Sequence, residues 1–282
     1  MTSTVFDNRV CTLGEGPLWH PERQQLYWFD ILSRQLLTLE NGVEKSWTFD
    51  EYVSAAAWVD EDTLVVASAT ALYRFDLRSG EKKVLCALEA DNDVTRSNDG
   101  RADPQGGFWI GTMGINAEDK AGAIYRFYKG ELRKLFADIT ISNSICFSPD
   151  GSLAYYCDTT THKIMKVGLD QDGWPLGTPE VFVDLGEDGF NPDGSVVDAA
   201  GNLWNAQWGA HRVACYSPSG EFLREVKFAA EQISCPAFGG PDLTTLFATS
   251  AAAELSGENE GKTFAIKLDD VTGQAEHAVL LD

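Results

Sequence analysis

Short hydrophobic runs, each followed by a cluster of polar turn residues, cover the chain from end to end. The runs hold four to eight β-prone residues, as at 26–30, 63–67 and 203–206, and the clusters between them are rich in Gly, Asp, Pro and Ser. Runs of this length are typical of β-strands, whereas patterns with the helical period and helix caps are nearly absent. The pattern therefore predicts an all-β protein of roughly two dozen short strands.

One spacing recurs six times along the chain. In each case a side chain stands ten or eleven residues before the first apolar residue of a strand-like run, with a polar turn between them. The six side chains are Glu15, Ser54, Asn98, Asn143, Asp193 and Cys235. A spacing that repeats in this way indicates equivalent positions in six repeated structural units.

These units predict the architecture of the chain. Each has about four short strands and a period of roughly 38 to 50 residues, which is typical of a β-propeller blade. We therefore predict a six-bladed β-propeller with four-stranded blades that forms one domain over residues 1–282. The last blade is expected to use the runs at 237–238, 246–249, 263–268 and 275–281. An N-terminal strand at 4–11 is expected to join it and close the ring without an exposed edge.

The charge and composition exclude several classes of partner. The chain carries 22 Lys and Arg against 43 Asp and Glu, a formal net charge of −21, which argues against nucleic-acid binding because phosphate contacts require clustered cations. No apolar run approaches a membrane span, and the N-terminus lacks the pattern of a signal peptide.

The six cysteines show no metal-binding spacing and several lie in apolar runs, so buried thiols are expected. We expect a cytoplasmic protein, and the sequence leaves open whether it is a monomer or a weak dimer.

The six equivalent side chains are expected to surround the mouth of the central channel, because the innermost strand of each blade lines it. Two of them are carboxylates and two are carboxamides, the oxygen ligands that suit Ca²⁺, Mg²⁺ or Mn²⁺. None is a histidine, so a His-rich zinc site is not indicated. The alternative is that they only satisfy turn backbones, since Asn and Asp are common turn residues. A turn-forming role readily explains one such residue, but it explains less readily why four oxygen-bearing residues occupy equivalent positions.

Five short motifs, in order along the chain, resemble those of one family. They are Gly14-Glu15-Gly16-Pro17-Leu18-Trp19, Arg96-Ser97-Asn98-Asp99-Gly100, Ile141-Ser142-Asn143-Ser144, Pro192-Asp193-Gly194 and Cys235-Pro236-Ala237-Phe238-Gly239-Gly240. The chain thereby resembles the gluconolactonase family, which includes senescence marker protein-30 (regucalcin), the luciferin-regenerating enzyme and bacterial sugar lactonases.

The resemblance implies a metal site and a substrate site. One divalent metal ion would be held by Glu15, Asn143 and Asp193, with Ca²⁺ favoured by the oxygen ligands and Mg²⁺, Mn²⁺ or Zn²⁺ as alternatives. Arg96, Asn98 and Glu118 would contact the ring oxygens and hydroxyls of the substrate. Glu118 is assigned by its place four residues before Gly122, in a loop of small and charged residues.

The expected activity is the metal-dependent hydrolysis of a sugar lactone to its aldonic acid in carbohydrate catabolism. A divalent ion would polarise the ester carbonyl, Asp193 would take the proton of the attacking water, and Arg96 would orient the polyhydroxylated ring. An esterase or organophosphate hydrolase could use the same site, and a calcium-binding or protein-binding scaffold without turnover is the alternative from another class. The roles of Asp99, as a supporting residue or a turn cap, and of Trp208, as a pocket wall or a core residue, stay open.

Overall fold

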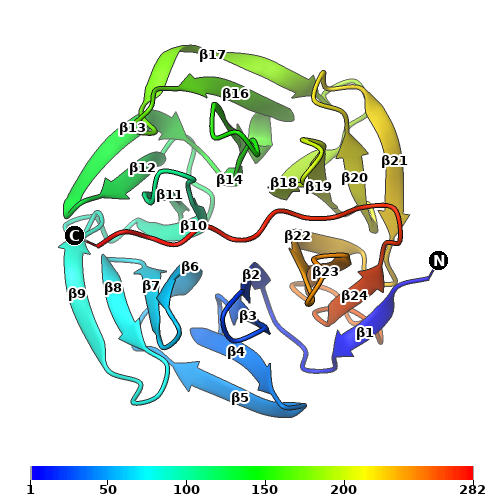
Figure 1. Ribbon diagram of the computed structural model, residues 1–282, viewed down its shortest axis with the longest axis horizontal. Coiled ribbons are helices and arrows are strands. Elements are labelled where there is room, and N and C mark those ends of the chain that lie inside the picture. The colour runs from blue at the N-terminus through cyan, green and yellow to red at the C-terminus, as the bar shows by residue number, and fades with distance from the viewer. Residues whose placement is uncertain (1, 282) are drawn as a thin grey trace.

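Four-stranded antiparallel sheets, built from the hydrophobic runs, repeat six times around a central axis in the computed structural model, which describes residues 2–281 (Figure 1). The prediction of a six-bladed β-propeller is confirmed. Within these residues the only helix is the single 3₁₀ turn η1 (Thr159–Thr161), and no helix is long and apolar enough to cross a membrane.

Within each blade, successive strands lie progressively further from the axis. The blades are numbered one to six in the chain order of their innermost strands. The innermost strands are β2 (Gly14–His20), β6 (Val53–Asp60), β10 (Thr95–Ala102), β14 (Ser142–Phe147), β18 (Asn191–Val197) and β22 (Gln232–Gly239). The second strands are β3 (Gln25–Asp30), β7 (Thr63–Ser68), β11 (Phe108–Gly114), β15 (Leu153–Asp158), β19 (Leu203–Trp208) and β23 (Thr245–Ala251). The third strands are β4 (Gln35–Glu40), β8 (Ala71–Asp76), β12 (Gly122–Tyr128), β16 (Lys163–Leu169), β20 (Arg212–Tyr216) and β24 (Thr263–Lys267). The outermost strands are β5 (Val43–Thr48), β9 (Lys82–Ala87), β13 (Glu131–Ile139), β17 (Pro175–Asp184), β21 (Phe222–Lys227) and β1 (Thr4–Asp7).

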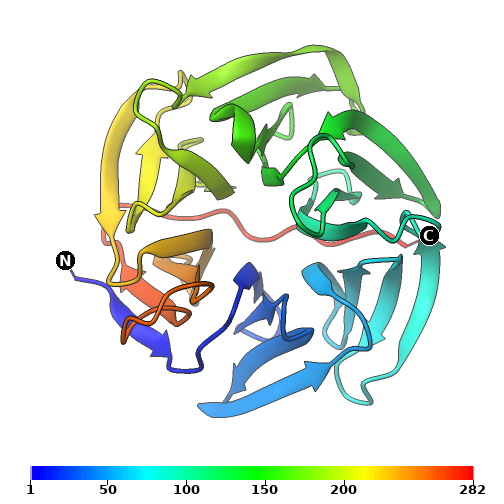
Figure 2. The ribbon, with the colours of Figure 1, turned by 180° about the vertical axis from the view of Figure 1, so that it is seen from behind.

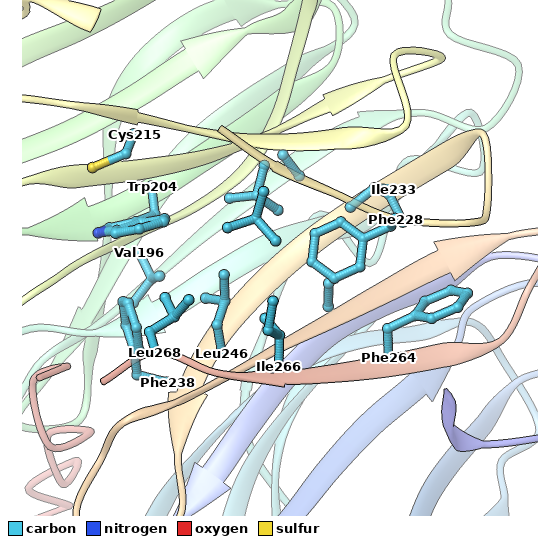
Figure 3. Close-up of a cluster of buried hydrophobic side chains, with 14 of the residues drawn as sticks. Val196, Trp204, Cys215, Phe228, Ile233, Phe238, Leu246, Phe264, Ile266 and Leu268 are labelled. Atoms are coloured by element: carbon cyan, nitrogen blue, oxygen red, sulfur yellow. The ribbon is translucent and has the colours of Figure 1, made fainter. Parts of the chain in front are cut away.

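The hydrophobic core lies between neighbouring blades. Figure 3 shows the cluster between blades five and six, where Trp204 of β19 meets Phe238 of β22 edge to face at 5.7 Å between ring centroids. Both rings are buried, and burial of a large apolar side chain contributes about 1.5–3 kcal/mol. Because each blade is covered on both faces, its second strand is buried along nearly its whole length rather than at alternate residues.

The N-terminal strand closes the ring, as predicted. In the outermost position of blade six, β1 pairs antiparallel with β24, with Thr4 opposite Ala265 and Val5 opposite Phe264. Just beyond β1, the guanidinium of Arg9 donates to the Asp7 carboxylate and to the carbonyl oxygen of Thr38 in blade one. The first and last blades are therefore joined by strand pairing and by a side chain.

The predicted strand at 275–281 was wrong, because β1 already occupies the fourth position in blade six. The residues 269–281 instead form an irregular segment, the C-terminal strap, that crosses the axis of the ring (Figure 1). Its amides bond to carbonyl oxygens of three blades: Gly273 to Leu243, Val279 to Trp58 and Leu280 to Gly106.

The strap covers one end of the channel, which we call the strap face. At this face the innermost strands end, and the Gln274 amide donates to the carbonyl oxygens of Phe147 in β14 and Val197 in β18. The close approach requires Gly273, since a Cβ there would lie 2.1 Å from the Cβ of Phe238. The innermost strands begin at the opposite end, which Figure 2 shows uncovered by the strap; we call it the pocket face.

Candidate functional site

Every innermost strand carries a β-bulge close to the pocket face. In blade four, Asn143 pairs with Cys157 and Cys146 with Tyr155, which leaves one extra residue on β14. The other five blades interrupt their pairing at the corresponding point. A bulge bends the strand and redirects its side chains, and bulges are common beside active sites. Each of the six side chains of the predicted ring lies within or beside one of these bulges.

The bulges bring most of the predicted site residues into one pocket of about 680 Å³ on the axis. The predicted residues that line it are Glu15, Arg96, Asn98, Asn143 and Asp193. Each of them is at least nine-tenths buried, so their polar atoms are held by the protein rather than by bulk water. Residues from blades one, three, four and five, far apart in the sequence, therefore share one cavity.

Three predicted residues are placed elsewhere. Ser54 is fully buried and donates to the Ser97 hydroxyl at 2.8 Å, and Cys235 lies against Gly194, so neither lines the pocket. Contacts with the neighbouring blades account for this, because Cys235 packs against Gly194 of blade five and Ser54 bonds to Ser97 of blade three. Glu118 also lies outside the lining: its carboxylate accepts from the backbone N and the amide of Asn116 in its own loop.

A directed chain of hydrogen bonds fixes the amide groups of the pocket floor. Arg96 Nη1 donates to Asn98 Oδ1 at 2.7 Å, and Asn98 Nδ2 donates to Asn143 Oδ1 at 3.0 Å. Asn143 Nδ2 in turn donates to Thr159 Oγ1 at 3.0 Å, whose hydroxyl donates to the Pro192 carbonyl oxygen at 2.8 Å. The chain sets the orientation of Asn143 and leaves a second lone pair on its Oδ1 for a ligand.

Negative charge accumulates around this floor without enough protein cations to balance it. Burial raises the pKa of Asp193 well above its usual range, and the neighbouring carboxylates of Glu15 and Asp99 add to the effect. Burial, together with Asp99, raises the pKa of Glu15 to about 8, while burial raises that of Asp99 to about 6. The Arg96 guanidinium lies nearby, but burial lowers its own pKa to about 10. The ionised form of these acids therefore requires an additional positive charge.

The donor set fits a hard divalent cation. Asp193 Oδ1 is buried and has no hydrogen-bond partner within residues 2–281, an arrangement that is costly unless a cation or a water meets it. The Glu15 carboxylate and the free lone pair of Asn143 Oδ1 face the same pocket. Over the same residues, no three His, Cys, Asp or Glu side chains are grouped as a metal site, so the candidate set depends on the Asn143 carboxamide.

The walls of the pocket include residues that sequence reasoning missed. Thr159, Thr160, His162 and Asn191 contribute polar groups from blades four and five. The apolar lining residues are Leu13, Leu32, Met113, Ile115, Ile141 and Ala253. Trp208 also lines the pocket, in agreement with one of the two roles considered for it. These residues lie in strand-connecting turns or near strand ends, where no hydrophobic period signals their orientation.

Asp99 supports the site from beneath the floor. It is buried, lines no part of the pocket, and accepts a hydrogen bond from the Ile145 backbone N at 2.7 Å. The bond connects the bulge of blade three to β14, next to Asn143. A carboxylate in this position holds neighbouring backbone in register, as supporting residues around metal sites commonly do.

The fold and the pocket together define a six-bladed β-propeller with an oxygen-rich site on its axis. Comparison with known sequences specifies the family: the sequence model of the SMP-30/gluconolactonase/LRE-like region matches residues 13–252, and the chain belongs to this family. The chain is 38% identical over 267 residues to the L-arabinolactonase of Azospirillum brasilense, covering 90% of this chain and 86% of that one. It is 33% identical over 274 residues to a 6-deoxy-6-sulfogluconolactonase of Pseudomonas putida, covering 94% of each.

A solved structure has nearly the same fold along its whole length. The chain superimposes with a TM-score of 0.96 on a calcium-binding protein, regucalcin, from Agrobacterium tumefaciens. The two are 39% identical, and the match covers 100% of this chain and 98% of that one. The resemblance found in the sequence motifs is therefore confirmed at the level of family and fold.

Proposed function

We propose that the chain hydrolyses a sugar lactone to the corresponding aldonic acid, with one divalent metal ion bound by Glu15, Asn143 and Asp193. A lactone is a cyclic carboxylic ester, so the chain is a hydrolase acting on ester bonds. The observation that carries the proposal is the buried, unpartnered Asp193 Oδ1 beside Glu15 and the oriented carboxamide of Asn143. The lactonase names of its relatives support the substrate class.

A divalent cation at these residues would act as a Lewis acid for the lactone carbonyl, with Ca²⁺ favoured by the oxygen ligands and Mg²⁺, Mn²⁺ or Zn²⁺ as alternatives. Asp193 is the proposed general base, because a carboxylate has two oxygens and can bridge a bound cation and the attacking water. The positive charge of the bound cation would offset the burial that raises the pKa of Asp193. Glu15 and Asn143 hold their oxygens in place through the bulges of blades one and four.

Arg96 and Asn98 are the proposed substrate-orienting residues. Arg96 forms no ion pair within residues 2–281, and Nη1 is its only nitrogen with hydrogen-bond acceptors there. Its other N–H groups remain available to ring oxygens and hydroxyls in the pocket. Glu118 stays a proposed substrate contact that would require its loop to turn the carboxylate away from Asn116.

The test is acid release from a panel of pentono- and hexonolactones, followed with a pH indicator. Protein stripped with EDTA is compared with the same protein after Ca²⁺, Mg²⁺, Mn²⁺ or Zn²⁺ has been added back. We expect turnover above the spontaneous rate only with added metal, and faster turnover of sugar lactones than of aryl esters or organophosphates. Metal binding with no turnover of any substrate would favour the alternative of a calcium-binding scaffold. The regucalcin from Agrobacterium tumefaciens is described as a calcium-binding protein.

The role of Asp193 is tested by Asp193→Asn at saturating metal. The carboxamide keeps an oxygen for the ion but accepts a proton poorly, so kcat should fall about 10²- to 10⁴-fold. A near-normal kcat with metal bound would contradict the assignment of Asp193 as the base.

We also propose that the protein acts in the cytoplasm on a small-molecule substrate.

A further inference from the structure

The wall of the pocket formed by blades four and five carries polar groups beyond the candidate metal ligands. Thr160, His162 and Asn191 lie there beside the apolar Ile141 and Trp208. Across the axis, the wall residues Leu13 and Leu32 of blade one are apolar. A sugar lactone is itself asymmetric, with its carbonyl at one end and hydroxylated carbons at the other. Besides Arg96 and Asn98 of blade three, the polar groups of blades four and five are therefore available to substrate hydroxyls.

His162 is held rigidly in the wall formed by blades four and five. It ends the turn η1 in a left-handed backbone conformation, with φ at 57°, and its backbone N donates to the Thr159 carbonyl oxygen. Its ring Nδ1 lies 2.9 Å from the Phe190 carbonyl oxygen, next to Asn191. Because a carbonyl oxygen can only accept, Nδ1 carries the proton, and Nε2 of the neutral ring is an acceptor.

The Nε2 atom of His162 has no hydrogen-bond partner within residues 2–281, although the residue lines the pocket. A lactone carbonyl and ring oxygen cannot donate to it, so the only sugar-lactone groups that can are hydroxyls. His162 belongs to the turn between β15 and β16, not to the innermost strand that carries Asn143. This position in the wall, away from the candidate metal ligands, suits contact with the part of the substrate distant from the carbonyl.

From this geometry we infer that His162 is a specificity residue that accepts a hydrogen bond, through Nε2, from a hydroxyl on the exocyclic side chain of the substrate. The inference rests on the proposed lactonase function and narrows its substrate class to lactones with a hydroxylated side chain. His162 takes no part in the proton transfer assigned to Asp193.

The chain provides a matched control. His211 has the same positive φ of 57° in the corresponding turn of blade five, but it does not line the pocket of the candidate site. Asparagine is the informative replacement at both positions. It tolerates the left-handed backbone, and its amide can keep the bond to the Phe190 carbonyl while removing the acceptor at Nε2.

The experiment compares kcat/KM of metal-loaded wild type, His162→Asn and His211→Asn on two lactones of equal ring size. D-galactono-1,4-lactone carries a dihydroxylated side chain, and threono-1,4-lactone carries none. Loss of one neutral hydrogen bond should lower kcat/KM of His162→Asn about 3- to 10-fold on the galactonolactone and less than about twofold on the threonolactone. His211→Asn should match wild type on both. An equal loss on both lactones, or no loss on either, would overturn the inference.

A binding measurement separates this inference from the proposed function. If wild type hydrolyses neither these two lactones nor any lactone of the panel, the proposed function fails. Calorimetric binding of the corresponding non-hydrolysable 1,4-lactams to wild type and His162→Asn then decides the role of His162. A selective loss of affinity for the galactono-lactam would support it, and equal affinities, or no binding to wild type, would overturn it.

Discussion

At the scale of single residues, the side chain of Asn143 is fixed by two hydrogen bonds. Its Oδ1 accepts from Asn98 while its Nδ2 donates to Thr159, so the carboxamide is held from both ends. Neighbours that orient a metal ligand commonly change metal affinity 10- to 100-fold when they are replaced. Thr159, which completes the chain to the Pro192 carbonyl oxygen, is such a neighbour.

We predict that Thr159→Val weakens binding of the divalent cation about 10- to 100-fold. Valine has a similar shape but leaves Asn143 Nδ2 without its acceptor, so the carboxamide can rotate away from the ligand position. Calorimetric titration with Ca²⁺ or Mn²⁺ measures the affinity directly. Thr160→Val is the control, because the Thr160 hydroxyl bonds to Asp158 rather than to a candidate ligand. Equal affinities of the two variants would exclude the positioning role.

At the scale of elements, the bulges decide which side chains reach the pocket. The residues that follow Glu15 and Asn143, which are Gly16 and Ser144, both have left-handed backbones, with φ of 54° and 61°. Blades one and four therefore present their candidate ligands through the same local conformation. Gly16 is further restricted, because a Cβ would lie 2.3 Å from the Ser54 carbonyl oxygen of blade two.

Gly16→Ala should destabilise the protein by more than backbone strain alone, which is about 1–2 kcal/mol for alanine in the left-handed region. The added methyl group would push β2 away from β6 and displace Glu15, so metal affinity should fall as well. Gly42→Ala isolates the strain, since Gly42 also has a positive φ, 77°, but no atom within 4 Å of the added Cβ. Urea unfolding measures the free energy of unfolding of both variants. If Gly16→Ala lowered it no more than Gly42→Ala does, the contact with the Ser54 carbonyl oxygen would be relieved without cost.

At the scale of the whole molecule, the C-terminal strap closes the strap face through a buried ion pair. Arg101, from β10, donates to the Glu276 carboxylate of the strap, and both side chains are largely buried. The strap adds a carbonyl contact, because the Trp58 indole donates to the Glu276 backbone oxygen at 2.8 Å. The two contacts connect the strap to the innermost strands of blades two and three, below the candidate site.

Removal of one partner should reveal how much the ring depends on this pair. Glu276→Ala leaves the Arg101 guanidinium buried and unpaired, which costs about 3–5 kcal/mol. Glu131→Ala, at an ion pair with Arg133 that is more than half exposed, should cost less than about 1 kcal/mol. Denaturant unfolding of the full chain measures both. A loss of less than about 1 kcal/mol for Glu276→Ala would show that water replaces the missing carboxylate.

The strap should also make stability depend on pH through His277. Burial lowers the pKa of His277 below its ordinary value of 6.5, against the opposing charges of Glu276 and Asp103, while Arg101 adds to the lowering. The unfolded chain therefore binds more protons than the folded one as pH falls below 6.5, and stability is lost there. Between pH 7.5 and 5.5, the unfolding free energy of wild type should therefore fall relative to that of His277→Gln. The raised pKa values of Glu15 and Asp99, which act in the opposite direction, and the lowered pKa of His20 are common to both proteins. Parallel pH profiles of the two proteins would contradict the prediction.

The sequence by itself determined the architecture, because a strand is encoded locally. Runs such as 26–30 and 203–206 have the length and composition of buried strands, and their even spacing requires repeated blades. The hydrophobic pattern did not indicate β5, β9 or β10. The outermost strands β5 and β9 carry charged residues at exposed positions, and the innermost strand β10 is composed mainly of polar residues that surround the site. The same register pointed to Glu15, Asn98, Asn143 and Asp193, which line the pocket, whereas Arg96 was assigned by the family resemblance.

The tertiary structure alone decided which side chains complete the site. Thr159 lies 16 residues from Asn143 and 33 from Pro192, and no local period signals that it joins them. Packing against Gly194 of blade five keeps Cys235 out of the pocket lining, and the strand pairing of β1 leaves the last residues free to form the strap. Each of these outcomes depends on contacts between segments distant in the sequence. A hydrophobic pattern records whether a residue is buried, but it does not record which distant residue it meets.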